Sequence, residues 1–219
     1  RLSGKNDFDI VHVATSGSLG FVKDILMLRK AKSIGLKTIL HFHFGRVPEI
    51  IESRNWEWHL LTARDQAHKR MLEALDRGEP LPFDLEGSAI YYVGPTPERP
   101  GAVIGSAGPT TSGRMDAMSP RLLDLGNKIM IGKGKRDAAV KEAVVRNGAV
   151  YLAALGGAGA LMAKSVQTLE VIAWPDLGCE AVRRLTVEKM PLTVILDAHG
   201  GDLYLSGPEA YRANQESGS

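Results

Sequence analysis

The stretch 101–116, GAVIGSAGPTTSGRMD, constrains the fold more than any other part of the chain. Four glycines and one proline within its sixteen residues exclude a regular helix or a central strand, and they let the backbone approach a ligand closely. The segment also carries consecutive hydroxyl groups and a guanidinium that matches a carboxylate, from Thr110, Thr111, Ser112 and Arg114. This pattern indicates a turn that holds an anion, and the alternative is a surface loop with a solvated arginine.

Composition limits the kinds of partner. The 219 residues, 44% of them apolar, suffice for one ordinary domain or two small ones. The net charge is +2 and no long basic run is present, so neither nucleic acid nor a membrane surface is expected as a partner. An anionic substrate would therefore have to be bound by cationic side chains close to its site, because the chain as a whole carries little net charge.

Cysteine content and hydropathy add two further expectations. The single cysteine, Cys179, excludes an internal disulfide and cannot supply the thiolates of an iron–sulfur cluster, and no metal ligands are predicted in this chain. No apolar stretch reaches the length of a membrane span and no signal layout opens the chain, which favours the cytoplasm. The first residue is Arg1 rather than Met, which is typical of a fragment or a trimmed product.

Residues 8–60 show the pattern of one βαβ unit. Apolar, β-branched runs predict strands at 8–15 and 37–44, and apolar residues at helical spacing predict helices at 21–34 and 48–60. A right-handed crossover is expected between the strands. His41 and His43 alternate on one strand face, but no third ligand lies at a telling spacing, so we interpret them as core or strand-end residues.

From residue 62 onward, short strands alternate with short helices, which predicts a mixed α/β domain. The first helix, 62–78, is expected to have Thr62 as N-cap with Asp65 in a capping box, and Gly78 at its end. The residues from Gly207 onward are polar and predict a frayed tail. The remaining predicted helices are 120–126, 137–147 and 161–166, and the predicted strands are 88–94, 103–105, 128–132, 149–154, 168–173 and 192–197.

Four blocks of sequence in this part carry a family resemblance. The blocks are TARDQAHKRM at 62–71, GPTTSGRMD at 108–116, MIGKGKR at 130–136 and AVYLAALGGAGALMAK at 149–164. Together they resemble the C-terminal (β) domain of the iron–sulfur class I fumarases, and equally the β-subunit of L(+)-tartrate dehydratase. The resemblance covers 62–207 and implies a swivelling β/β/α domain there, followed by a polar tail at 208–219.

The resemblance also implies roles for particular residues. Arg64, Arg114 and Lys133 would bind the two carboxylates of a small dicarboxylate, because paired arginines fix a carboxylate in register. Thr110 would bind substrate and act as the base that removes a C–H proton, with Arg114 assisting, and Thr111 remains the alternative. Possible pocket-lining residues are His68, Thr111 and Asp65.

Two of these assignments have alternatives. Arg64 lies near a helix N-terminus, where a cation opposes the helix dipole, so an anion shared with the free N–H groups would explain its position. The alternative is a surface cation. His68 lies one turn further along the same face and would line the pocket or be solvated.

The family resemblance implies a partner as well. Class I fumarases use a [4Fe–4S] cluster held by cysteines of the α domain, which this sequence lacks. A β half that works with a cluster-bearing α-subunit or α domain is therefore expected, acting as a hydro-lyase on fumarate and malate or on tartrate.

Residues 8–60 have a separate resemblance, to the N-terminal domain of a GT-B family 4 glycosyltransferase, carried by FDIVHVAT, the Ser/Gly loop and HFHFGR. The two resemblances meet at Leu61–Thr62, which indicates a mosaic chain with a fragment at 1–61. The alternatives to a hydro-lyase half are a nucleotide-sugar-binding fragment or an inactive mosaic with an unpaired sheet edge before Thr62.

Overall fold

The computed structural model describes residues 10–15, 37–42 and 60–216, with side chains from residue 60 to residue 213. The chain divides into two compact units, one of residues 1–57 with 188–190 and one of residues 58–187 with 191–219. In the first unit, β1 (Ile10–Thr15) and β2 (Lys37–Phe42) pair in parallel. The predicted helix at 21–34 and all but the last residue of the predicted helix at 48–60 lie outside the described residues, and that last residue, Leu60, is in a strand instead. The glycosyltransferase resemblance and the junction at Leu61–Thr62 stay predictions.

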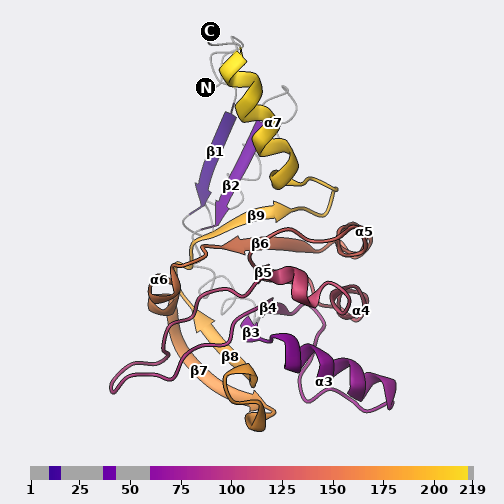
Figure 1. Ribbon diagram of the computed structural model, residues 1–219, viewed down its shortest axis with the longest axis vertical. Helices are drawn as coiled ribbons and strands as arrows, with labels where there is room; N and C mark the ends of the chain where they lie inside the picture. The colour runs from indigo at the N-terminus through magenta and orange to yellow at the C-terminus, as the bar shows by residue number, and fades with distance from the viewer. Residues whose placement is uncertain (1–9, 16–36, 43–59, 217–219) are drawn as a thin grey trace. The chain divides into compact units, whose positions relative to one another are not determined.

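The second unit is built on a seven-stranded mixed sheet in the order β7-β8-β3-β4-β5-β6-β9 (Figure 1). The four central strands run parallel, and the outer strands β8, β7 and β9 are antiparallel to their neighbours. This confirms the predicted α/β fold class. The strands are β3 (Leu60–Thr62), β4 (Ala89–Tyr91), β5 (Ile129–Gly132), β6 (Val150–Ala154), β7 (Val166–Ala173), β8 (Val182–Val187) and β9 (Leu192–Leu196).

Helices connect the parallel strands. In Figure 1, α3, α4 and α5 follow one another along the right of the view and α6 lies on the left. The Asp137 carboxylate caps α5 by accepting a hydrogen bond from the Val140 N–H at 2.8 Å, and Gly148, with φ +58°, follows its end. The helices are α3 (Asp65–Asp76), η2 (Ser112–Met115), α4 (Ser119–Asp124), α5 (Ala138–Arg146), α6 (Gly159–Lys164), η3 (Pro175–Glu180) and α7 (Leu203–Glu216).

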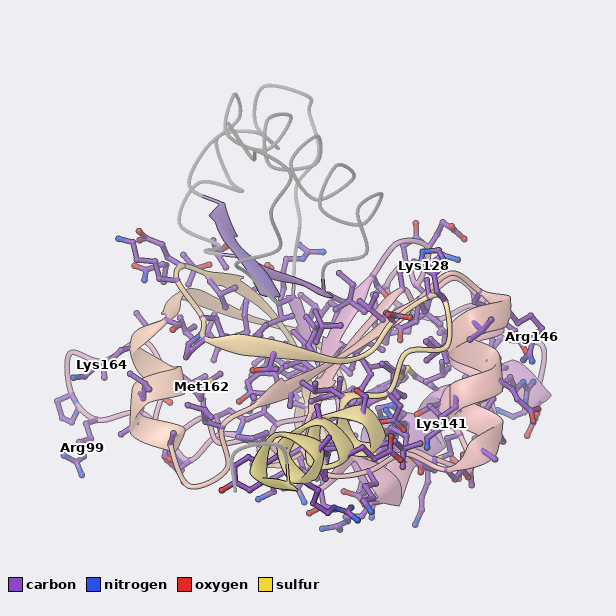
Figure 2. All side chains as sticks on the ribbon, turned by 90° about the horizontal axis from the view of Figure 1, so that it is seen from above. Arg99, Lys128, Lys141, Arg146, Met162 and Lys164 are labelled. Carbon is purple, nitrogen blue, oxygen red and sulfur yellow. The ribbon has the colours of Figure 1, made fainter. Side chains whose placement is uncertain are left out.

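The core lies between the sheet and these helices. Met162 of α6 is fully buried, whereas Lys164 on the same helix points outward (Figure 2). At the opposite end of this unit, Lys128 donates to the Asn147 carbonyl at 2.8 Å and so caps the last turn of α5. In this unit the largest fully buried side chains are Tyr91, Tyr92, Tyr151, Met71, Ile90, Met115, Leu122, Leu123, Met130, Met162 and Leu185.

The entry to α3 differs from the prediction. Thr62 is the last residue of β3 rather than a helix N-cap, and its hydroxyl donates to the Ala181 carbonyl at 3.3 Å and accepts from the Arg183 N–H at 3.0 Å. The N-cap is Arg64, which offers no side-chain acceptor. The predicted capping box with Asp65 is therefore wrong, because pairing with β8 keeps Thr62 extended.

Three further elements differ from the sequence-based predictions: the strand at 103–105, strand β8 and the C-terminal helix α7. Among residues 60–216, no strand forms at 103–105, and β8 was missed because its outward positions are polar. The frayed tail predicted from Gly207 is wrong, since α7 continues to Glu216 and begins after Asp202, whose carboxylate accepts from the Tyr204 N–H at 2.9 Å. The unpaired sheet edge before Thr62, which belonged to the alternative of an inactive mosaic, is not found, because β3 lies between β8 and β4.

A buried cation connects the two sequence blocks that carry most of the candidate residues. The Arg136 side chain is 0% exposed and its Nε donates to Asp116 at 2.6 Å. The other Asp116 oxygen accepts from the Asp137 N–H at 2.8 Å. The guanidinium lies over the rings of Tyr92 and Tyr151, 5.4 and 5.1 Å from their centres. The loop at 108–116 is thereby fixed against the end of β5.

We predict that Arg136→Met lowers the free energy of unfolding by about 3–5 kcal/mol, because the Asp116 carboxylate would remain buried without its partner. Arg121→Met is the matched control, since Arg121 pairs with Asp76 at the surface, where such pairs contribute about 0–1 kcal/mol. Urea denaturation of both variants measures the difference. Equal losses would contradict a stabilising role for the buried pair.

Candidate active site

The candidate site forms where β4 ends. The Tyr91 carbonyl accepts the Ala63 N–H at 3.2 Å, and the Tyr92 carbonyl accepts the Thr110 N–H at 2.7 Å. The Tyr92 N–H in turn donates to the Ile131 carbonyl at 2.8 Å. Three segments far apart in sequence therefore meet at the carboxyl ends of the parallel strands, where open α/β sheets bind ligands.

Arg64 follows β3 and lies against the chain just beyond β4. A Cβ atom on Gly94 would lie 2.9 Å from an Nη of Arg64 and 3.0 Å from its Cδ, so the arginine occupies space that only glycine leaves open. The side chain is 19% exposed. Arg64 is therefore partly buried at the end of the sheet, and the alternative of an ordinary surface cation is wrong.

Asp65 connects the two candidate arginines. Its Oδ1 accepts from the Nε of Arg114 at 2.7 Å, and its Oδ2 lies 3.5 Å from an Nη of Arg64. Asp65 is 14% exposed, whereas Arg114, on η2, is 54% exposed. The structure thus brings Arg64 and Arg114, 50 positions apart in the sequence, to the same carboxylate.

A second carboxylate lies at the start of α3. One Glu180 oxygen accepts the Gln66 N–H at 2.8 Å and the other lies 3.7 Å from Arg64. The anion that the sequence predicted at this helix N-terminus is thus provided by the protein itself, from η3. Sequence reasoning missed Glu180, because a residue 114 positions away from Gln66 gives no local signal.

Thr110 and Thr111 are placed differently. Thr110 is half-buried beside β4, whereas Thr111 is exposed and forms an isolated parallel bridge with Lys133. Ser112 fixes this bridge, since its N–H donates to the Lys133 carbonyl at 2.8 Å and its hydroxyl accepts the Lys133 N–H at 3.0 Å. The structure therefore brings the hydroxyl turn alongside the end of β5.

The Lys133 side chain extends toward the loop after β6. A Cβ on Gly156 would lie 3.4 Å from its Cδ and 3.9 Å from its Nζ. The neighbouring Gly159 packs against the loop at 106–108, where the Ala107 N–H donates to the Gly159 carbonyl at 3.0 Å. The sequence predicted close packing or an active-site wall at 156–159, and close packing is found at Gly159, where a Cβ would lie 3.0 Å from the Gly108 nitrogen, whereas Gly156 and Gly157 are exposed.

His68 lies beneath the site and is fully buried, so of the two alternatives for this residue the solvated histidine is wrong. Its Nδ1 lies 2.9 Å from the Arg64 carbonyl, which can only accept, so Nδ1 carries the proton and donates it. The ring meets Tyr92 edge to face at 5.2 Å. Burial, aided by the charge of Arg136, lowers the pKa of His68 to about 4, so the ring is neutral at pH 7.

Unsatisfied polar atoms concentrate in this one turn of the chain. Four buried side-chain nitrogen or oxygen atoms between residues 60 and 213 lack a hydrogen-bond partner. Three of them are Nε of Arg64, Oδ2 of Asp65 and Nε2 of His68. Buried polar groups are normally paired, and exceptions call for an explanation such as a ligand. Of the three, only the Arg64 Nε is a donor that could meet an anion, since the Asp65 oxygen accepts and His68, with its proton on Nδ1, also accepts at Nε2.

The chain's own donors do not fit an iron–sulfur cluster. Cys179 is the single cysteine of the sequence and is exposed. In the described part of the chain, no group of three His, Cys, Asp or Glu side chains is arranged to hold a metal ion.

No helix in the described part of the chain is both long and apolar enough to cross a membrane. The cytoplasmic location stays a prediction.

We predict that His68 makes stability depend on pH. The unfolded chain binds a proton at His68 below about pH 6.5 and the folded chain only below about pH 4, so stability falls as pH decreases through that window. The loss is on the order of 3 kcal/mol and should be absent in His68→Phe. Urea denaturation between pH 7.5 and pH 4 measures both profiles, and parallel profiles would contradict the assignment.

The sequence is similar to proteins of known families. Residues 52–207 match the family described as "Fumarase C-terminus". Fumarate hydratase 2 of Leishmania major is 41% identical over 151 residues, covering 66% of this chain and 26% of that protein. The putative L(+)-tartrate dehydratase subunit beta of Methanocaldococcus jannaschii is 40% identical over 151 residues, covering 66% of this chain and 77% of that protein.

A third relative, the L(+)-tartrate dehydratase subunit beta of Escherichia coli, is 32% identical over 162 residues, which cover 72% of this chain and 79% of that protein. The chain spans about a quarter of the length of the fumarate hydratases that it matches, but most of the tartrate dehydratase β-subunits. All four blocks that carried the resemblance lie within the matched residues. The chain therefore belongs to the Fumarase C-terminus family.

Proposed function

We propose that this chain is the β half of an iron–sulfur hydro-lyase that reversibly hydrates fumarate to malate, with L(+)-tartrate as the alternative substrate. The observation that carries this proposal is the meeting of Arg64 and Arg114 at the Asp65 carboxylate. Family membership supports the reaction class, and the two kinds of relative support the two substrates.

The cations would act on both carboxylates of the substrate. Arg114 uses its Nε for Asp65 and keeps its terminal nitrogens for a ligand, while the Arg64 Nε has no partner. In the dehydration direction, loss of the C–H proton leaves an electron pair that spreads into the adjacent carboxylate. Cations that face this carboxylate stabilise the developing charge more than the ground state.

Thr110 would take the proton. An alcohol is a very weak acid, so its oxygen serves as a base only where a cation stabilises the alkoxide, and Arg114 is the candidate for this role. Thr110 is half-buried beside β4 and its hydroxyl has no hydrogen-bond partner among the described residues, whereas Thr111 is exposed. These features favour Thr110 over Thr111.

Removal of the substrate hydroxyl needs chemistry that this chain does not supply. The proposed source is a [4Fe–4S] cluster on an α-subunit or α domain, because one cysteine cannot hold it here. The relatives named as β-subunits support such a partner. Arg64, Thr110, Arg114 and Lys133 would then face that partner.

We predict that purified chain gains hydratase activity when it is mixed with a fumarase-type α-subunit carrying its cluster, and that Arg114→Ala lowers kcat/KM about 100-fold or more. Arg121→Ala is the control, since Arg121 is also an exposed arginine in an ion pair. Absorbance of fumarate measures the activity, and tartrate assayed in parallel identifies the substrate. Activity of Arg114→Ala equal to that of the control would overturn the proposed clamp.

The two threonines are separated by a second experiment. Thr110→Val should lower kcat by about 10²–10⁴-fold with little change in KM, because it removes the proton acceptor and keeps the side-chain shape. Thr111→Val should retain activity within a few fold. Steady-state kinetics of both variants decides the assignment, and the reverse pattern would make Thr111 the base.

A further inference from the structure

Helix α3 starts without a cap of its own. Its N-cap residue is Arg64, with extended backbone and no side-chain acceptor for the first-turn N–H groups. Such N–H groups are normally satisfied by a Ser, Thr, Asp or Asn side chain at the N-cap. An arginine there leaves them open and also places a positive charge at the positive end of the helix dipole.

Glu180 compensates for both problems at once. One carboxylate oxygen accepts the Gln66 N–H at 2.8 Å, which satisfies a first-turn donor. The other lies 3.7 Å from the Arg64 guanidinium, which offsets the cation. Glu180 is 16% exposed, so the solvent screens these interactions only in part.

The segment that carries Glu180 is fixed from both sides. Arg183 donates to the carbonyls of Gly178 at 2.7 Å and of Cys179 at 3.0 Å. Thr62 at the end of β3 donates to the Ala181 carbonyl. These bonds come from two neighbouring strands of the sheet, β3 and β8, so η3 holds the Glu180 carboxylate in a fixed place above the start of α3.

We propose that Glu180 is a positioning residue that orients the Arg64 guanidinium for the substrate carboxylate. The inference rests on the proposed hydro-lyase function and extends it to a residue that does not itself touch the substrate. Glu180 pairs with Arg64 through charge at 3.7 Å, and Asp65 does so at 3.5 Å from within the helix. Two carboxylates thus hold the guanidinium from two elements.

The pairing leaves the Arg64 donors available. Arg64 makes no side-chain hydrogen bond within the described part of the chain, and its buried Nε has no partner. The hydrogen bond of Glu180 goes to the Gln66 N–H and not to the Arg64 guanidinium. A carboxylate that occupied the position of the substrate carboxylate would hydrogen-bond the Arg64 guanidinium directly. Glu180 does not, so its geometry fits a residue that orients Arg64 and not one that blocks substrate binding.

The test compares Glu180→Gln with Glu79→Gln in the chain mixed with the cluster-bearing α-subunit. Glu79 pairs with Arg77 on the surface, so its variant makes the same chemical change away from the site. Glu180→Gln keeps an acceptor for Gln66 but loses the charge that faces Arg64, and we expect KM to rise about tenfold with kcat changed less than about twofold. The Glu79→Gln control should keep both parameters.

Glu180→Asp serves if the amide variant does not fold. It keeps the charge and withdraws the carboxylate by about 1.5 Å, so its KM should lie between those of wild type and Glu180→Gln. A KM at or below the wild-type value in these variants would overturn the proposal, because a carboxylate that only repels the substrate raises KM and its removal lowers it.

A measurement on the chain alone separates this inference from the proposed function. The Nε–H signal of Arg64, assigned by its loss in Arg64→Lys, should exchange with water about fivefold or more faster in Glu180→Gln than in wild type, because a released side chain reaches the solvent. Unchanged exchange overturns the positioning role. Absence of hydratase activity in the wild-type mixture, with faster exchange in the variant, overturns the hydro-lyase function alone.

Discussion

The main-chain hydrogen bonds at the end of β4 are the constraint on which the site depends. The Tyr91 carbonyl accepts the Ala63 N–H as the last bond of the β3–β4 ladder, whereas the Tyr92 carbonyl, one residue beyond β4, accepts the Thr110 N–H of the hydroxyl turn. This ends the regular ladder after three residues and brings the first turn of α3 and the hydroxyl turn to one edge of the sheet. Backbone groups cannot be left unpaired when buried, so this placement resists substitution of most side chains.

Charge is the second constraint. Arg64, Arg114 and Lys133 come to one end of the sheet, and like charges there would oppose folding. Asp65 and Glu180 lie close to two of these three cations and offset part of their charge. The two carboxylates belong to α3 and η3, and they leave the Nε of Arg64 without a hydrogen-bond partner.

Beneath the site, neutral His68 and charged Arg136 are both buried around Tyr92. The two are distinguished by their partners: Arg136 has the Asp116 carboxylate, whereas His68 has only a carbonyl as acceptor. A cation is stable in the first setting and costly in the second. The Tyr92 ring therefore contacts both a permanently charged group, Arg136, and a group that stays neutral at pH 7, His68.

The sequence alone predicted a mixed α/β domain, three of the four central strands (β4, β5 and β6), helices α3–α5 and the four blocks of the family, because periodicity and glycine placement are local signals. It also proposed Arg64, Thr110, Arg114 and Lys133 for one site. Only the tertiary structure decided that Thr62 is a strand residue, that α7 replaces a frayed tail, and that Glu180 caps α3. These depend on hydrogen bonds between residues more than a hundred positions apart, or on packing, and neither leaves a pattern in neighbouring residues.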